Sequence, residues 1–151
     1  LRLQPEGHGR IVIRSASSLS FSLIGLGLLL AGPVAAQETP NCENAMTQSE
    51  MTQCANIDWL KADAELNAVY RSAMEKMTET DAYLPEGLKG AVETLREAQR
   101  AWIPYRDKAC DAYGFLARGG TMEPMLVYGC RADLTRNRID ELRQLGEGLG
   151  N

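Results

Sequence analysis

Residues 86–117, EGLKGAVETLREAQRAWIPYRDKACDAYGFLA, contain the pattern from which we predict the fold. Seam positions recur in alternating steps of four and three, the spacing of a helix that packs on its neighbours at a shallow angle. This seam consists of Leu88, Val92, Leu95, Gln99, Trp102, Arg106, Ala109 and Tyr113. We therefore predict one helix over residues 86–117, with Pro85 near its first turn and Gly119-Gly120 just beyond its end.

Helical patterns also precede and follow this stretch. Thr47 and Glu50 form a T-x-x-E capping box, which predicts a helix start, and helical spacing continues to about Glu79. Thr121 is a candidate cap for a third helix, which we expect to end at Gly146. The short connections predict an all-α domain, a small antiparallel three-helix arrangement stapled by two disulfides.

The first 36 residues have the features of a secretory signal peptide. Arg2, Arg10 and Arg14 precede the uncharged apolar stretch 19–31, and cleavage is expected after Ala36. The apolar stretch is shorter than the roughly 20 residues of a membrane span, so we expect no stable membrane anchor after cleavage. We predict a signal peptide at 1–36, a polar N-terminal arm at 37–46, a helical domain at 47–146 and a tail at 147–151. The expected localisation is periplasmic or secreted, in a bacterium.

Net charge gives a first indication of the partner. Loss of residues 1–36 removes three of the 16 basic and one of the 20 acidic residues, so the net charge changes from −4 to −6. An acidic surface disfavours nucleic acid and favours cationic partners. We therefore expect no nucleic-acid partner.

The cysteines predict the two disulfides, because an even number in a small exported domain is typical of a disulfide framework. All four follow the signal peptide: Cys42, Cys54, Cys110 and Cys130. A hairpin mirrored about residue 82 places Cys54 opposite Cys110, which favours the pairing Cys54–Cys110 and Cys42–Cys130. A mirror about Gly119-Gly120 instead places Cys110 opposite Cys130 and leaves Cys42 with Cys54, so this pairing stays open as well.

Catalytic patterns are largely absent from the sequence. His8 is the single histidine and lies in the predicted signal peptide, so no histidine-dependent nucleophile is expected. The wide cysteine spacings do not match a zinc site. Paired carboxylates of the kind that hydrolyse glycosides remain a minor alternative. We expect a protein that is not an enzyme and has neither a metal nor a cofactor.

Six polar side chains form a candidate network on the predicted helices: Asp63, Glu65, Asn67, Tyr70, Gln99 and Arg106. The mirror about residue 82 predicts Arg106 near Asp58, and Gln99 near Glu65 and Asn67. One interpretation is that these residues satisfy one another and fix the helix register. The other is that they form a polar site that holds a ligand.

Three motifs carry a resemblance to a known family. They are D-x-E-L-N-x-x-Y at 63–70, Q-R-x-W at 99–102 and Y-R-D-x-x-C at 105–110. Together they resemble the N-terminal domain of the LprI-like lysozyme inhibitor family, over about residues 42–145. The resemblance implies an all-helical exported domain and, for the namesake of the family, binding and inhibition of lysozyme.

We therefore expect a binding protein whose acidic face docks on a cationic muramidase and blocks its cleft. The expected partner is lysozyme or another cationic envelope protein. The candidate contacts are Glu93, Glu97, Asp107, Asp111, Arg118 and Glu123. The alternative is an interaction or structural module of the cell envelope that does not inhibit lysozyme.

Overall fold

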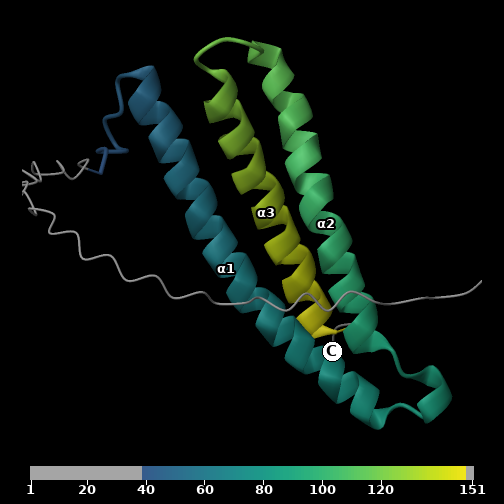
Figure 1. Ribbon diagram of the computed structural model, residues 1–151. Helices are drawn as coiled ribbons and strands as arrows, with labels where there is room; N and C mark the ends of the chain where they lie inside the picture. Colours follow the sequence, from purple (N-terminus) through teal and green to yellow (C-terminus); the bar gives the residue numbers. More distant parts are fainter. Residues whose placement is uncertain (1–38, 149–151) are drawn as a thin grey trace, which may run out of the picture. The chain divides into compact units, whose positions relative to one another are not determined.

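The structure, a computed structural model, describes residues 39–148 (Figure 1). Helix α1 spans Gln48–Tyr83, α2 spans Ala91–Gly114 and α3 spans Glu123–Glu147, with short 3-10 turns η1 at Glu86–Leu88 and η2 at Phe115–Ala117. No strand occurs in this range. The predicted all-α fold of three helices with two disulfides is confirmed. The predicted signal peptide and the last three residues of the predicted tail lie outside the described residues.

None of the helices between residues 39 and 148 is both long enough and apolar enough to cross a bilayer.

The helices run up and down, with α1 parallel to α3 and α2 antiparallel to both. Asp58 pairs with Arg136 and Glu65 pairs with Arg143, and both pairs join residues 78 positions apart. A constant offset between two helices means that they run in the same direction. Figure 1 shows the same arrangement, in which α2 runs from the α1–α2 connection at one end of the bundle to the α2–α3 connection at the other end. The contact of α1 with α3 is the most extensive in the bundle, and that of α1 with α2 is the smallest of the three.

The apolar core lies in the half of the bundle nearer the α1–α2 connection. Its buried members come from all three helices: Leu66, Ala73, Leu95, Ile139 and Leu142. Fully burying a Leu or Ile side chain contributes about 1.5–3 kcal/mol relative to leaving it exposed. This cluster therefore holds the three helices together along a common seam.

The start of α1 is confirmed at the predicted capping box. Thr47 is the N-cap, its hydroxyl accepts from the Glu50 backbone N–H at 3.2 Å, and the Glu50 carboxylate accepts from the Thr47 N–H at 2.8 Å. These bonds satisfy two amide groups that have no partner within the helix. The helix continues beyond the predicted end at Glu79, to Tyr83.

The predicted boundaries of α2 are wrong at both ends. The α-helix begins at Ala91 rather than at residue 86, because Gly90 has a φ of 138° that no helical residue adopts. Leu88, predicted on the seam, lies in η1 and is 68% exposed. At the other end the α-helix stops at Gly114, and residues 115–117 form the 3-10 turn η2.

The predicted cap of α3 is also wrong. Its N-cap is Met122, and neither that residue nor Thr121 caps the helix through its side chain. Instead the Glu123 carboxylate accepts from the backbone N–H of Gly119 at 2.8 Å. This bond lowers the pKa of Glu123 below its ordinary value and ties the helix to the preceding turn. The helix ends at Glu147, one residue beyond the predicted Gly146.

The disulfides join Cys42 to Cys54 and Cys110 to Cys130, so the favoured pairing was wrong and the alternative is found. The Cα atoms of the two pairs are 5.5 and 5.4 Å apart. The error lies in the assumed hairpin register. The Asp63–Arg106 contact moves the midpoint of the α1–α2 hairpin beyond residue 84, so that Cys110 faces residue 59 rather than Cys54.

Helix α2 is capped from a distance by Asp81, near the end of α1. The carboxylate of Asp81 accepts from the backbone N–H groups of Gly90, Ala91 and Val92 at 2.9, 2.9 and 3.1 Å. These three bonds favour the charged form, and they lower the pKa of Asp81 below its ordinary value of 3.8. One side chain thus closes the connection and satisfies the first amides of α2.

We predict that Asp81→Ala lowers the Tm by several degrees at neutral pH, because it removes the cap of a whole helix. A group with a depressed folded-state pKa stabilises the fold above its unfolded-state pKa, and this contribution is lost as the pH falls through the folded-state pKa. The Tm difference from the parent protein should therefore shrink below about pH 3.8. Thermal unfolding followed by circular dichroism across pH measures this. A difference that stays constant down to the most acidic pH contradicts the capping role.

Candidate functional site

A buried guanidinium lies at the centre of the bundle. Arg106 is 5% exposed, and its guanidinium carbon lies 5.5 Å from the centroid of the Trp59 ring and 5.2 Å from that of Trp102. Arginine over an aromatic face gains about 0.5–2 kcal/mol, more when water is excluded. The rings of the two tryptophans therefore exclude water from the guanidinium and at the same time stabilise its charge through their π-electron faces.

Arg106 donates hydrogen bonds to acceptors on all three helices. Its Nη1 donates to Asp63 on α1 at 3.0 Å and to the Thr135 hydroxyl on α3 at 3.5 Å, and its Nε donates to Asp107 at 3.0 Å. Thr135 is fully buried. A buried charge is tolerated when it is paired and hydrogen-bonded in this way. The prediction that Arg106 faces the neighbourhood of Asp58 holds for Trp59, the next residue, but Asp58 itself pairs with Arg136 of α3 and the carboxylate partner of Arg106 on α1 is Asp63.

A second arginine extends this cluster toward the α2–α3 connection. Arg131 lies 5.1 Å from the centroid of the Trp59 ring, and its nitrogens lie 3.5 Å from Asp107 and 3.3 Å from Asp111. Trp59 also stacks on Tyr128 of α3, with ring centroids 5.8 Å apart. We call these residues the arginine–tryptophan cluster: Trp59, Asp63, Trp102, Arg106, Asp107, Asp111, Tyr128, Arg131 and Thr135.

The contribution of α3 to this region was not predicted from the sequence. Arg131, Thr135 and Arg138 lie at positions i, i+4 and i+7, which places them on one face of the helix. This spacing could have predicted that the three residues face the interior, because the same face of the helix carries the buried Leu142. Polar residues in line with a buried leucine indicate a polar layer inside the bundle.

Five of the six residues of the predicted network line one pocket between α1 and α2, of about 420 Å³. We call this pocket the α1–α2 groove. The five residues are Asp63, Asn67, Tyr70, Gln99 and Arg106. The sixth, Glu65, pairs with Arg143 of α3 instead, so its predicted position near Gln99 was wrong. The predicted proximity of Gln99 and Asn67 agrees with their shared position on this lining.

The groove combines cationic, polar and apolar walls. Arg96 and Arg100 of α2 add two further guanidiniums, and Leu66 and Ile103 supply apolar surface. Gln99 is 8% exposed, and its side-chain oxygen accepts from Arg138 Nε at 3.1 Å. The amide nitrogen of Gln99 has no hydrogen-bond acceptor among residues 39–148. The groove therefore offers several donors.

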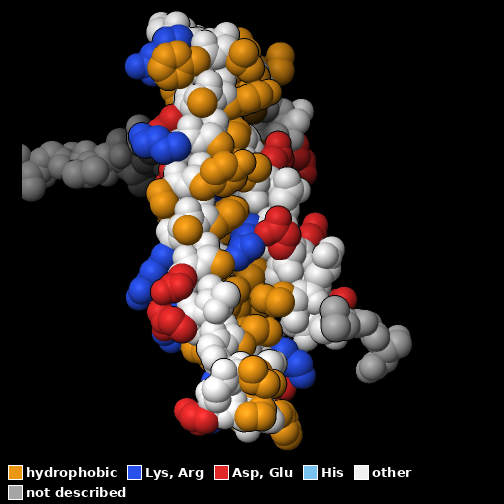
Figure 2. All heavy atoms as spheres, turned by 90° about the vertical axis from the view of Figure 1, so that its right-hand side faces the viewer, with side chains coloured by type: hydrophobic (Ala, Val, Ile, Leu, Met, Phe, Trp, Pro, Cys, Tyr) orange, Lys and Arg blue, Asp and Glu red, His pale blue; other side chains and the backbone are white. Residues whose placement is uncertain are grey.

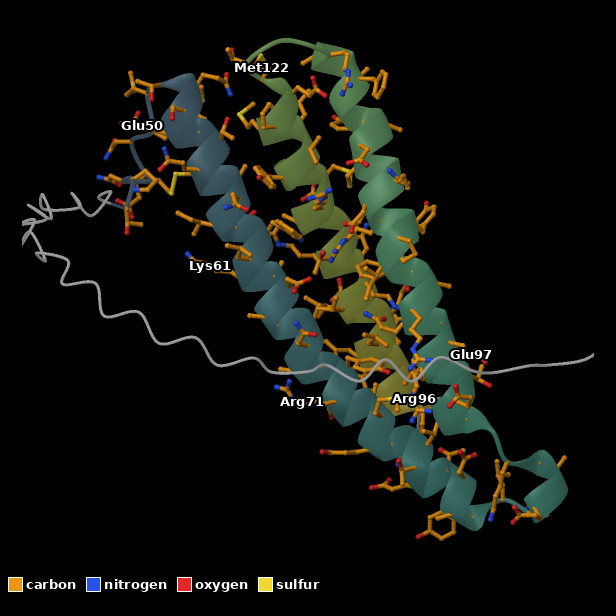
Figure 3. The ribbon with its side chains drawn as sticks, viewed as in Figure 1. Glu50, Lys61, Arg71, Arg96, Glu97 and Met122 are labelled. Carbon is orange, nitrogen blue, oxygen red and sulfur yellow. A yellow bond between two sulfur atoms is a disulfide. The ribbon has the colours of Figure 1, made fainter. Side chains whose placement is uncertain are left out.

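Four of the six candidate partner contacts lie on α2, Arg118 lies in the α2–α3 connection and Glu123 begins α3, and five of the six take part in ion pairs. Glu93 pairs with Arg96, and Arg118 pairs with Glu123. Asp107 and Asp111 pair with arginines of the arginine–tryptophan cluster. Glu97 alone of the six makes no ion pair within the described residues, and Figure 3 shows it on the outer side of α2. The expected acidic face is therefore largely neutralised.

Exposed apolar side chains gather on the outer face of α2 and at the α2–α3 connection. We call these residues the apical surface: Tyr105, Tyr113, Phe115, Leu116 and Met122. Figure 2 faces α2 and shows apolar side chains along this face and at the end of the bundle. Leu116 is 74% exposed and Phe115 is 62% exposed. Exposed apolar groups in one patch are typical of a protein interaction site.

The α2–α3 connection is held in place on several sides. Gly119 has a φ of 77°, in the left-handed region that favours glycine, and its N–H donates to Glu123. The Arg118 guanidinium lies 4.6 Å from the centroid of the Phe115 ring. The Cys110–Cys130 disulfide joins α2 to α3 directly below this connection. The exposed apolar tip is therefore presented in a fixed conformation.

A metal centre is not formed by the side chains that the structure describes. Across residues 39–148, no three His, Cys, Asp or Glu side chains come together as metal ligands.

These features define the class of protein: a disulfide-stapled helical bundle with a buried arginine layer and an exposed apolar end. The chain belongs to the family described as lysozyme inhibitor LprI, whose model matches residues 40–142. It is also 47% identical over 132 residues to an uncharacterized protein of Rhizobium meliloti (strain 1021), covering 85% of this chain and 95% of that protein. No solved structure gives a significant match. The two disulfides fit an extracytoplasmic protein.

Proposed function

We propose that this protein is exported to the periplasm or secreted, where it binds a lysozyme and inhibits it by steric block. The observation that carries the proposal is membership of the lysozyme inhibitor LprI family over residues 40–142. The two disulfides support export, because they form and persist in oxidising compartments.

The apical surface is the proposed contact with the enzyme. Apolar and aromatic anchors supply most of the free energy of protein association, and Phe115 and Leu116 are the most prominent ones at this end of the bundle. The disulfide and the Glu123 bond keep the connection ordered, which reduces the entropy lost on binding. Of the candidate contacts, Asp107, Asp111, Arg118 and Glu123 lie toward this end of the bundle and form the proposed polar rim, whereas Glu93 and Glu97 lie in the first turns of α2, toward the opposite end. Such a rim increases the association rate with a cationic muramidase.

Titration of the oxidised protein into a lysozyme that is lysing a cell-wall suspension tests the proposal. We expect saturable loss of lysis near one-to-one stoichiometry. The double variant Phe115→Ser, Leu116→Ser should raise the inhibition constant about 30-fold, because losing a binding hot spot costs about 2 kcal/mol. Both side chains are exposed, so the fold should tolerate the change.

Tyr83→Ser is the matched control, because Tyr83 is 90% exposed and is the last residue of α1, a helix that ends at the opposite end of the bundle from the α2–α3 connection (Figure 1). It should inhibit like the parent protein. The variant Asp111→Lys tests the acidic rim, and its association rate should fall, most strongly at low salt. Glu93→Lys, Glu97→Lys reverses two carboxylates at the far end of α2 and should lower the association rate less. No inhibition of any lysozyme class overturns the proposal. Recovery of a different envelope protein in a pull-down would then favour the non-inhibitory alternative.

A further inference from the structure

The α1–α2 groove carries more positive charge than its own lining balances. Three guanidiniums line it, from Arg96, Arg100 and Arg106, against the single carboxylate of Asp63. Arg106 is neutralised by Asp63 and Asp107, and Arg96 pairs with Glu93 of the same helix. Arg100 makes no ion pair with any residue of the described range and is exposed. A cation without a partner therefore lies at the edge of the groove.

A donor without an acceptor lies on the lining of the same groove. The side chain of Gln99 is fixed, because its oxygen accepts from Arg138 Nε at 3.1 Å, and only 8% of the residue is exposed. The amide nitrogen of Gln99 meets no acceptor among residues 39–148. This nitrogen is therefore available to an acceptor that enters the groove.

The shape and the remaining walls limit the size and polarity of the ligand. A volume of about 420 Å³ suits a small molecule rather than a protein segment. The ring of Tyr70 and the side chains of Leu66 and Ile103 give apolar contact, and Leu66 is buried. We therefore expect a ligand that is a single small molecule carrying an anionic group and either a small apolar group or a sugar ring.

We propose that the α1–α2 groove binds the carboxylate of a small molecule, such as the free C-terminus of a short peptide or an acidic sugar. Carboxylate oxygens match both the guanidinium fork of Arg100 and the amide nitrogen of Gln99, and charge-assisted bonds of this kind are about twice as strong as neutral ones. The Asp63 carboxylate, which already accepts from Asn67 at 3.3 Å, can also accept from an N–H or O–H of the same ligand. The inference does not depend on lysozyme.

Calorimetric titration of the oxidised protein distinguishes the two sources. The peptide probe is N-acetyl-alanyl-alanine, compared with its C-terminal amide. The sugar probe is N-acetylmuramic acid, compared with neutral N-acetylglucosamine. We expect saturable binding of one acid and at least about tenfold weaker binding of its neutral counterpart. The acid that binds identifies the source of the carboxylate.

Three variants test the site itself. Gln99→Glu keeps the oxygen that accepts from Arg138 but replaces the donor with a second negative charge, and Arg100→Gln removes the free cation. Each should weaken acid binding at least about tenfold while the Tm stays close to that of the parent. The control is Arg71→Gln, because Arg71 is exposed and projects from α1 away from α2 and therefore away from the groove (Figure 3). Arg96, which lines the groove, lies on the side of α2 that faces α1. It should bind like the parent protein.

Three results overturn the proposal: equal binding of acid and neutral probes, equal weakening by Arg71→Gln and Arg100→Gln, or no saturable binding of either acid. Failure to inhibit lysozyme leaves it intact, because the groove and the apical surface are tested by different readouts.

Discussion

Replacing Arg106 with Ala is expected to lower the free energy of unfolding by about 3 kcal/mol. The change leaves the carboxylates of Asp63 and Asp107 without their shared partner and opens a void beside Trp59 and Trp102. Removing one member of a buried ion pair costs about 3–5 kcal/mol. The lower figure applies because both carboxylates remain 37% exposed and regain some hydration. Urea unfolding of the oxidised protein measures the loss.

Two further substitutions separate the charge of Arg106 from its shape. Arg106→Lys keeps the charge but loses the planar fork that joins three helices, so we expect an intermediate loss of stability. Arg106→Met keeps much of the packing but removes the charge, and it should be less stable than the parent, because both carboxylates remain. Arg71→Ala is the control, since this exposed arginine should change stability by no more than about 0.5 kcal/mol. If Arg106→Ala costs no more than Arg71→Ala, the cluster does not stabilise the bundle.

Local signals in the sequence predicted much of this arrangement. The capping box at Thr47 and Glu50 uses atoms three residues apart, so its geometry follows from the sequence alone. The regular seam of α2 likewise predicted the buried positions of Leu95, Gln99 and Arg106. Those positions depend only on helical periodicity. The predicted proximity of Gln99 and Asn67 depended in addition on the assumption that consecutive helices are neighbours, and the two residues do line one pocket between α1 and α2.

The errors concern contacts that local sequence does not determine. The favoured cysteine pairing assumed a hairpin of α1 and α2 mirrored about residue 82, whereas the Asp63–Arg106 contact sets a midpoint beyond residue 84 and the main contact of α1 is with the parallel helix α3. Glu65 therefore faces Arg143 rather than Gln99. The start of α2 depends on the Asp81 carboxylate, nine to eleven residues earlier in the chain. Such long-range partners are selected by the packing of whole helices, and a periodic pattern on one helix does not identify its neighbour.

The double variant Cys110→Ala, Cys130→Ala is expected to lose about 3 kcal/mol of stability in the chain-entropy model, because this disulfide closes a loop with a sequence separation of 20. Cys110 is fully buried, so the lost sulfur contacts add to this. The matched variant Cys42→Ala, Cys54→Ala should lose less. Without the Cys42–Cys54 bond, the exposed arm before α1 gains conformational entropy in the folded state. This gain offsets part of the conformational entropy that the unfolded chain gains when the bond is removed. Urea unfolding compares the two variants.

Tryptic mapping without reduction tests the pairing on which this difference rests. No Lys or Arg lies between Cys42 and Cys54, so both stay within the peptide that ends at Lys61. Cleavage after Lys108, Arg118 and Arg131 should give peptides 109–118 and 119–131, joined by the second disulfide. The crossed pairing would instead join the peptide ending at Lys61 to both of these, and it would contradict the structure. With the observed pairing, one bridge joins the arm before α1 to α1 itself and the other joins α2 to α3, so neither links α1 to α2. The register of α1 against α2 then depends on Arg106 and its partners rather than on a covalent bond.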